Sequence, residues 1–133
     1  MEFFSKTTHP LTAEQIQNEI TGPRLAEFCA SIDRVLNWDI KTDSGEMYCL
    51  WGQFRVNRES LKRGVRFSLP ECPDALAWTI TAEPHATVIH CTINQQEHDP
   101  DFIESIETFV EDLSNGIKYQ INHLAADPMH LPA

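Results

Sequence analysis

The chain has 133 residues, of which 41% are hydrophobic and 23% charged, a composition typical of a globular protein and not of a disordered or fibrous one. With 20 acidic against 10 basic residues, its formal net charge is -10. Because an acidic surface repels phosphate backbones and anionic lipids, neither nucleic acid nor a membrane is an expected partner. The length predicts a single domain, 1–133, large enough to bury a core without disulfides or metals.

The four cysteines predict free thiols in a reducing compartment. No CxxC pair occurs among Cys29, Cys49, Cys72 and Cys91. Isolated cysteines of this kind behave as small buried hydrophobes. The N-terminal residues lack the apolar core of a signal peptide, and no apolar run is long enough to span a membrane. We therefore expect a cytoplasmic protein.

Helical patterns come first along the chain. Glu2–Phe4 is too short to assign, so whether it forms an edge strand stays open. Thr12 with Gln15 forms a capping box, which predicts a helix over residues 12–20. Gly22-Pro23 ends that helix and predicts a second one over residues 23–37, whose apolar positions share one stripe.

Five strands are predicted next, from runs in which apolar and polar residues alternate. Turn-forming residues such as Asp43–Gly45, Asn57–Ser60 and Pro70–Asp74 separate some of these runs. The five predicted strands cover residues 38–42, 46–56, 61–69, 76–82 and 87–93.

A long amphipathic helix completes the pattern. Asp99-Pro100 is an N-cap followed by proline, and an apolar stripe predicts a helix over residues 100–125 with a weak point at Gly116. The tail over residues 127–133 is expected to be loose. The predicted fold is α+β, a five-stranded antiparallel meander sheet with two N-terminal helices and one long C-terminal helix packed on it.

Turn lengths fix a register, and the register assigns each strand residue to one face of the sheet. One face carries an apolar row that predicts the core: Trp38, Leu50, Phe67, Trp78 and Cys91. The other face carries a mixed row: Trp51, Arg66, Thr79 and His90. Arginine binds carboxylates and phosphates, histidine titrates near neutral pH, and tryptophan offers a flat apolar wall. We predict the mixed row as a ligand-binding site; the alternatives are a helix-covered interface and ordinary solvated sheet.

Basic side chains gather in one predicted hairpin, at Arg55, Arg58, Lys62 and Arg63. No aromatic platform or recognition helix accompanies them, so they do not resemble a nucleic-acid site. They predict docking on an acidic protein partner; the alternative is a solvated hairpin that resists edge aggregation. Acidic residues on the final helix leave a homodimer open as well.

Motifs for catalysis, cofactors and metals are not found in the sequence. The histidines lack the spacing of a zinc site, and strand geometry points His90 and Cys91 to opposite faces. There is no glycine-rich phosphate loop and no nucleophile elbow. We therefore expect no metal and no cofactor, and favour a protein that is not an enzyme.

The order of the elements resembles two known classes. If Glu2–Phe4 forms a strand, the order resembles helix-grip ligand-binding domains, in which a long C-terminal helix closes a curved sheet over an apolar cavity. Small size and acidity also resemble bacterial secretion chaperones, although a helix splits the strands there. The sequence favours a non-enzymatic binding or adaptor domain for a protein partner; the alternatives are a small-molecule-binding helix-grip-like domain, which could also be an enzyme, and a secretion-chaperone-like protein.

Overall fold

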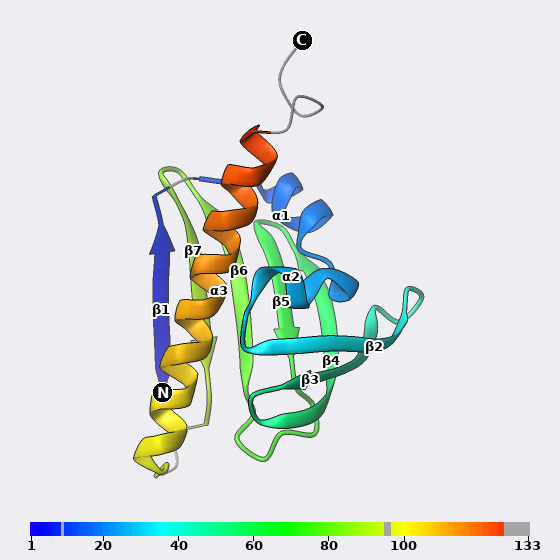
Figure 1. The fold of residues 1–133 in the computed structure, drawn as a ribbon, viewed down its shortest axis with the longest axis vertical. Helices are drawn as coiled ribbons and strands as arrows, with labels where there is room; N and C mark the ends of the chain where they lie inside the picture. Colours follow the sequence, from blue (N-terminus) through cyan, green and yellow to red (C-terminus); the bar gives the residue numbers. More distant parts are fainter. Residues whose placement is uncertain (9, 95–96, 127–133) are drawn as a thin grey trace.

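The computed structural model describes residues 1–8, 10–94 and 97–126, so the tail expected over residues 127–133 lies outside the described residues. The described residues form seven strands and three α-helices (Figure 1). The strands are β1 (Glu2–Thr7), β2 (Ile32–Asp39), β3 (Ser44–Cys49), β4 (Gly52–Leu61), β5 (Gly64–Ser68), β6 (Ala77–Glu83) and β7 (Ala86–Thr92). The helices are α1 (Ala13–Glu19), α2 (Leu25–Phe28) and α3 (Pro100–Ala126), and one turn of 3₁₀ helix at Gly22–Arg24 leads into α2.

All seven strands belong to one antiparallel sheet in the order β1-β7-β6-β5-β4-β3-β2. Strands β2 to β7 form a meander, and β1 pairs with β7, so the first strand lies beside the last. The sheet is strongly bent, with β2 and β3 running across the upright strands, and α2 and α3 lie over the same side of it (Figure 1). The predicted α+β class holds, whereas the predicted five-stranded sheet is wrong.

The second helix predicted over residues 23–37 is mostly wrong. Only the 3₁₀ turn and the four residues of α2 are helical, and the backbone is already extended at Cys29. Ile32–Asp39 forms β2, an edge strand paired with β3. Its β-branched and aromatic residues suit a pleated surface, and strand pairing outweighs their helical spacing. Trp38 then covers Gly22 so closely that a Cβ on this glycine would lie 2.0 Å from the indole.

The strand predicted over residues 46–56 is in fact two strands. β3 and β4 meet at a two-residue loop, Leu50-Trp51, after which Gly52 takes a φ of 110°, a conformation that glycine adopts readily. Cys49 pairs with Gly52, so the two-residue loop shifts the alternation of faces by one residue, and a single continuous strand cannot reproduce that shift. The turn expected over residues 57–60 lies inside β4, and the chain reverses at Lys62-Arg63 instead.

The core lies between the sheet and the helices. The predicted apolar row is confirmed at its centre, where Phe67 pairs with Trp78 and Trp78 with Cys91, all three buried. At the other end the row is wrong, because Leu50 is 43% exposed and Trp38 is only half-buried. Over this core α3 is one continuous helix, whose buried side chains include Ile106, Phe109, Val110, Leu113 and Ile117.

The middle of α3 is held against the N-terminal segment. A Cβ on Gly116 would lie 1.9 Å from the carbonyl oxygen of Phe28, so this glycine allows the close approach of α2 and is not a break in α3. Cys29 Sγ donates to the carbonyl oxygen of Phe109 at 3.7 Å, and Ser31 Oγ donates to Asp112 at 2.5 Å. These contacts fix the position of α3 over the sheet.

The N-termini predicted for the first and the last helix are confirmed. Thr12 Oγ1 accepts from the Gln15 backbone N–H at 3.0 Å, and the Gln15 side chain accepts in return from the Thr12 N–H at 2.9 Å. Asp99 accepts from the Asp101 N–H at 2.8 Å. Each of these bonds satisfies a backbone donor that the first helical turn leaves unpaired.

Candidate functional site

Three of the four residues predicted as a ligand-binding row lie side by side, on the face of the sheet opposite the helices. Arg66 pairs with Thr79, and Thr79 pairs with His90. The row continues on one side to Glu59, whose carboxylate lies 3.3 Å from Arg66, and on the other to Phe4, whose ring stacks on His90 with centroids 4.3 Å apart. The row is an open ladder of cross-strand pairs, and its role in ligand binding stays a prediction.

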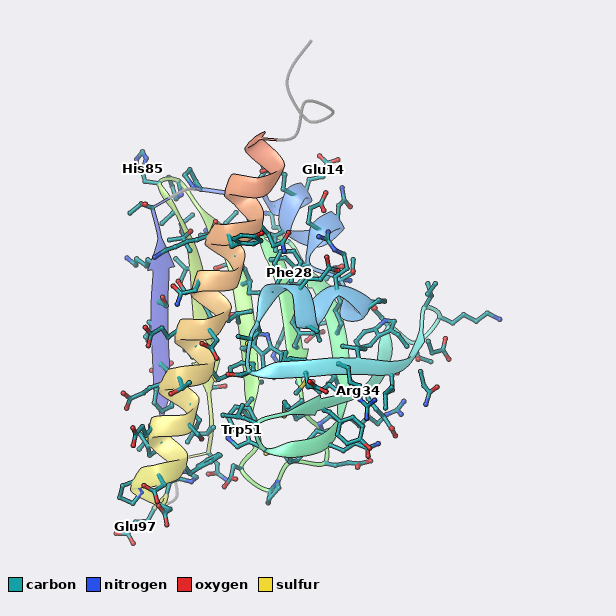
Figure 2. All side chains as sticks on the ribbon, viewed as in Figure 1. Glu14, Phe28, Arg34, Trp51, His85 and Glu97 are labelled. Carbon is teal, nitrogen blue, oxygen red and sulfur yellow. The ribbon has the colours of Figure 1, made fainter. Side chains whose placement is uncertain are left out.

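Trp51 is not part of this row. Because β4 continues through the expected turn, the register shifts and Trp51 does not reach Arg66. The indole lies on the helical side instead, where its ring centroid is 6.2 Å from that of Phe102 and 5.1 Å from that of Phe109. Trp51 Nε1 donates to Ser105 Oγ at 2.8 Å. Trp51 therefore joins the β3–β4 loop to the first turns of α3, where Figure 2 labels it.

Beside Trp51 lies a small cavity, which we call the mouth pocket, of about 100 Å³. It opens between the β3–β4 loop, the β5–β6 loop and the start of α3. Its lining is apolar except for one carboxyl group and comprises Trp51, Phe54, Leu69, Cys72, Pro73, Asp74, Leu76 and Phe102. Pockets for drug-sized ligands measure roughly 300–1,000 Å³, whereas dry apolar cavities of roughly 150 Å³ hold a benzene-sized molecule. The mouth pocket belongs to the smaller kind.

The β5–β6 loop is a compact wall of the mouth pocket. Leu69 donates its N–H to the Leu76 carbonyl oxygen at 3.1 Å, and Cys72 donates to the Leu69 carbonyl oxygen at 3.0 Å. Ala75 donates to the Cys72 carbonyl oxygen at 3.1 Å and has a φ of 53°, a left-handed conformation that persists only where the surroundings hold it. The loop therefore offers a preformed surface to an occupant.

A buried histidine ties this loop to the segment after β7. His98 Nδ1 lies 3.5 Å from Asp74 Oδ1, and His98 Nε2 lies 3.1 Å from the carbonyl oxygen of Asn94. Asn94 in turn donates its backbone N–H to the Asp74 carbonyl oxygen at 2.9 Å. Both ring nitrogens of His98 are engaged in this way, so neither is presented to the Cys72 thiol as a general base would be.

A chain of aromatic contacts runs from the mouth pocket into the core. Beyond Trp51, Phe109 packs on Trp78 with ring centroids 4.9 Å apart, and Trp78 packs on Phe67 at 5.4 Å. Trp78 is 1% exposed, and its Nε1 has no hydrogen-bond partner among the described residues. A buried donor without an acceptor is unfavourable by about 1–3 kcal/mol, so this indole N–H is a candidate contact for a ligand atom.

The buried thiols are poorly suited to nucleophilic chemistry. Burial raises the pKa of the Cys29 thiol and of the Cys91 thiol to about 12. Burial also raises the pKa of Cys49. Because the thiolate is the nucleophile, these three side chains stay protonated and inert near neutral pH.

The four predicted partner-binding residues do not form one patch. Arg58 is only 9% exposed: its guanidinium donates to the carbonyl oxygens of Gln17 and Ile20 at 2.6 and 3.1 Å, and to Asp43 at 2.8 Å. It therefore supports the end of α1 from within. The other three basic side chains are exposed, at Arg55, Lys62 and Arg63. Their role in partner binding stays a prediction.

The architecture defines an α+β protein of the helix-grip, START-like class. Among solved structures the chain is similar to a START superfamily protein from Mycobacterium smegmatis, with a TM-score of 0.62 and 10% sequence identity over 93% of this chain and 97% of that chain. At this identity the likeness shows the fold alone. No family model and no curated protein matches the sequence. No helix in the described parts of the chain has the length and apolar character needed to cross a membrane.

Among the residues that line the mouth pocket, sequence reasoning proposed only Trp51 as a site residue, and placed it on the wrong face. Leu69 and Leu76 were expected in strands and Phe102 on the helix stripe, but nothing in the sequence joined them. One signal was present: Pro70–Asp74 is a loop with apolar residues at both ends. Such a loop turns apolar side chains toward whatever element packs against it, here the start of α3.

Proposed function

We propose that this chain is a non-enzymatic helix-grip domain that binds a small, mostly apolar molecule in the mouth pocket. The observation that carries the proposal is the apolar cavity where the β3–β4 loop, the β5–β6 loop and the start of α3 meet. The fold supports the proposal, because helix-grip domains resemble one another in closing a long C-terminal helix over an apolar cavity. We therefore prefer binding of a small molecule to the role of an adaptor for a protein partner.

The size of the pocket defines the class of ligand. A volume of about 100 Å³ accepts a single ring or a short aliphatic chain, and Trp51 and Phe102 offer ring faces for it. Transfer of such a molecule from water is driven by the hydrophobic effect. A larger ligand would have to displace Trp51 and break its bond to Ser105.

Trp78 adds a polar preference. Its buried Nε1 lacks an acceptor among the described residues, and Trp78, near the start of β6, follows the pocket wall residue Leu76 by two residues. An occupant with a carbonyl or hydroxyl oxygen on its inner end would remove the penalty of this unpaired donor. We therefore expect a small ketone or alcohol to bind more tightly than the hydrocarbon of the same size.

Binding without chemistry follows from the groups around the pocket. His98 is engaged on both ring nitrogens by Asp74 and Asn94, which leaves the Cys72 thiol without a base. A cytoplasmic setting is part of the proposal, supported by four cysteines that are all free thiols.

Titration of the isotope-labelled protein with cyclohexanone and with cyclohexane tests the proposal. We expect shifts of the Trp51 indole N–H resonance, and tighter binding of the ketone. Cys72→Phe should fill the pocket and weaken cyclohexanone binding at least tenfold, since the lining leaves no space for both rings. Leu50→Phe adds the same ring at an exposed position outside the lining and should bind as the wild type does.

The proposal is wrong if Cys72→Phe binds the ketone as tightly as the wild type does, or if the shifts map to another part of the molecule. Trp78→Phe tests the polar preference separately. It keeps the ring and removes the N–H, so the advantage of ketone over hydrocarbon should vanish while both still bind.

A protein partner is the second candidate function. The observation that favours it is the exposure of Arg55, Lys62 and Arg63 on the β4–β5 hairpin, which would suit an acidic surface. Capture of such a partner should weaken with added salt and with the double substitution Lys62→Glu and Arg63→Glu. If neither added salt nor the double substitution weakens the capture, this second candidate function is wrong.

A further inference from the structure

The outer edge of β1 presents backbone groups that no described strand pairs with, because the sheet order ends at β1. Met1 and Ile93 exchange two backbone hydrogen bonds of 3.1 Å. Hydrogen-bonded and non-hydrogen-bonded pairs alternate along an antiparallel ladder. The backbone groups of Phe3 and Ser5 therefore face β7, whereas those of Glu2, Phe4 and Lys6 face away from the sheet.

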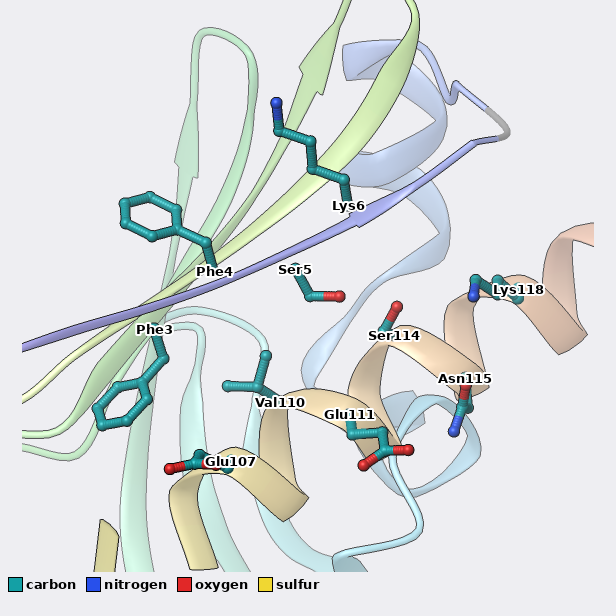
Figure 3. A pocket seen from close by; sticks show the side chains of 10 residues that line it. All are labelled: Phe3, Phe4, Ser5, Lys6, Glu107, Val110, Glu111, Ser114, Asn115 and Lys118. Atoms are coloured by element: carbon teal, nitrogen blue, oxygen red, sulfur yellow. The ribbon is translucent and has the colours of Figure 1, made fainter. Parts of the chain in front are cut away.

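A groove runs along this edge, between β1 and α3, with a volume of about 480 Å³. We call it the edge groove (Figure 3). Phe3 and Ser5 point into it toward Val110 and Ser114 of α3, while Phe4 and Lys6 point to the opposite face. β1 and α3 run side by side in the same direction (Figure 1). The groove thus follows an open strand edge, which is the place where a further strand can add.

We propose that this edge takes the β1 strand of a second copy of the chain, so that two subunits pair about a two-fold axis at Phe4. In this register Phe4 faces the partner's Phe4, and Glu2 faces the partner's Lys6 on both sides of the axis. The backbone groups of Glu2, Phe4 and Lys6 already point outward, so the ladder of hydrogen bonds can form without a shift of β1. The two sheets become one continuous sheet, and both α3 helices lie on the same face of it.

The side chains of Glu2, Phe4 and Lys6 are complementary to the same side chains of a second copy that runs in the opposite direction. Glu2, Phe4 and Lys6 are all exposed, and Phe4 is 62% exposed. Lysine on an edge strand usually prevents pairing; here each lysine meets a glutamate, and opposite charges in directly facing positions stabilise a sheet. A contact in which the same patch serves both subunits is the form that closed dimers take.

The groove side of the strand fits the same register. Phe3 faces the partner's Ser5, so a large side chain lies beside a small one on each side of the axis, and the partner's Phe3 enters the groove. The two α3 helices run antiparallel across the axis. Glu107 and Glu111 of one helix then lie near the part of the other helix that carries the partner's Lys118. In each copy these three residues are exposed and line the groove.

Sedimentation of the untagged full chain over roughly 10 µM to 1 mM, the range of weak association, tests the proposal. We expect a dimer that forms as concentration rises. Glu2→Lys or Lys6→Glu should each weaken it about tenfold, because each puts two like-charged pairs across the axis. The double variant with both changes should regain the wild-type affinity, although it lacks the 2.9 Å contact of Glu2 with His90.

Amide exchange locates the contact. The amides of Phe4 and Lys6 should become protected at high concentration, whereas those of Phe3 and Ser5 should be protected at every concentration by β7. A chain that stays monomeric throughout, a dimer that both single variants leave unchanged, or a swap that fails to restore association would each overturn the proposal. Arg34→Glu at the opposite edge of the sheet is the matched control and should leave the dimer intact.

Discussion

The mouth pocket and the edge groove both border α3, and they differ in almost every physical respect. The mouth pocket holds about 100 Å³ behind aromatic rings, whereas the edge groove holds about 480 Å³ and is lined by charged residues and an open strand edge. An enclosed apolar space favours the binding of a small molecule that leaves water, whereas an open polar groove favours the binding of a strand that supplies backbone hydrogen bonds. One helix can therefore serve two kinds of binding, at its start and along its flank.

Removing the aromatic support behind the mouth pocket should have the largest effect. Phe109 is fully buried and packs on both Trp51 and Trp78, so Phe109→Ala should lower the free energy of unfolding by about 3–4 kcal/mol. Phe4→Ala, beside the edge groove, removes an exposed ring and should lower it by less than about 1 kcal/mol. Urea unfolding of both variants measures the contrast, and similar losses would contradict the view that only the inner region is closely packed.

The contrast between enclosed and open positions extends to two arginines of one hairpin. Arg58→Met leaves Asp43 and the carbonyl oxygens at the end of α1 without their donor, so we expect a loss of about 2–3 kcal/mol in unfolding free energy. Arg63→Met removes a solvent-exposed ion pair with Glu83, which should change it by less than about 1 kcal/mol. A salt titration adds a second check, because the surface pair alone should be screened.

The buried cysteines make the stability depend on pH. The pKa of Cys29 and of Cys91 is raised by burial from 9.0 to about 12, so the folded state favours the neutral thiol. Their contribution to stability is complete below pH 9 and is lost as the pH rises toward 12, by about 1.4 kcal/mol per pH unit for each thiol. Alkaline unfolding curves measure this loss.

Thiol labelling at pH 8 gives a related check of the mouth pocket. Cys72, in the pocket wall, and Cys49 are half-buried, whereas Cys29 and Cys91 are buried. In a Cys49→Ala background we therefore expect Cys72 to react first, and Cys72→Ala to remove the fast phase. A fast phase that survives this substitution would mean that the core opens more readily than the pocket.

The parts of the fold that the sequence could predict are those governed by local signals. Strands β5 to β7, their register, the capping box at Thr12 and the start of α3 all follow from alternation, turn residues and caps within a short stretch of chain. Strand β2 could not be predicted in this way. Its apolar residues satisfy a helical spacing as well, and only the presence of β3 beside it decides between the two.

The candidate site is less predictable for a related reason. The face on which Trp51 lies depends on a two-residue loop, at which the alternation of faces shifts by one residue. Leu76 and Phe102 become neighbours only when α3 closes over the sheet. No spacing in the sequence encodes that meeting, although the residue types themselves, apolar and aromatic, are those that a small-molecule pocket requires.

The pairing of β1 with β7 also sets an order of events during synthesis. Among the described strands residues 2–7 are made first, yet their partner residues 87–92 appear only after β2 to β6 have been made. Closing so long a loop is slow compared with forming a hairpin. β1 therefore stays without its partner strand while β2 to β6 are made, and the described sheet is completed only when β7 has been made.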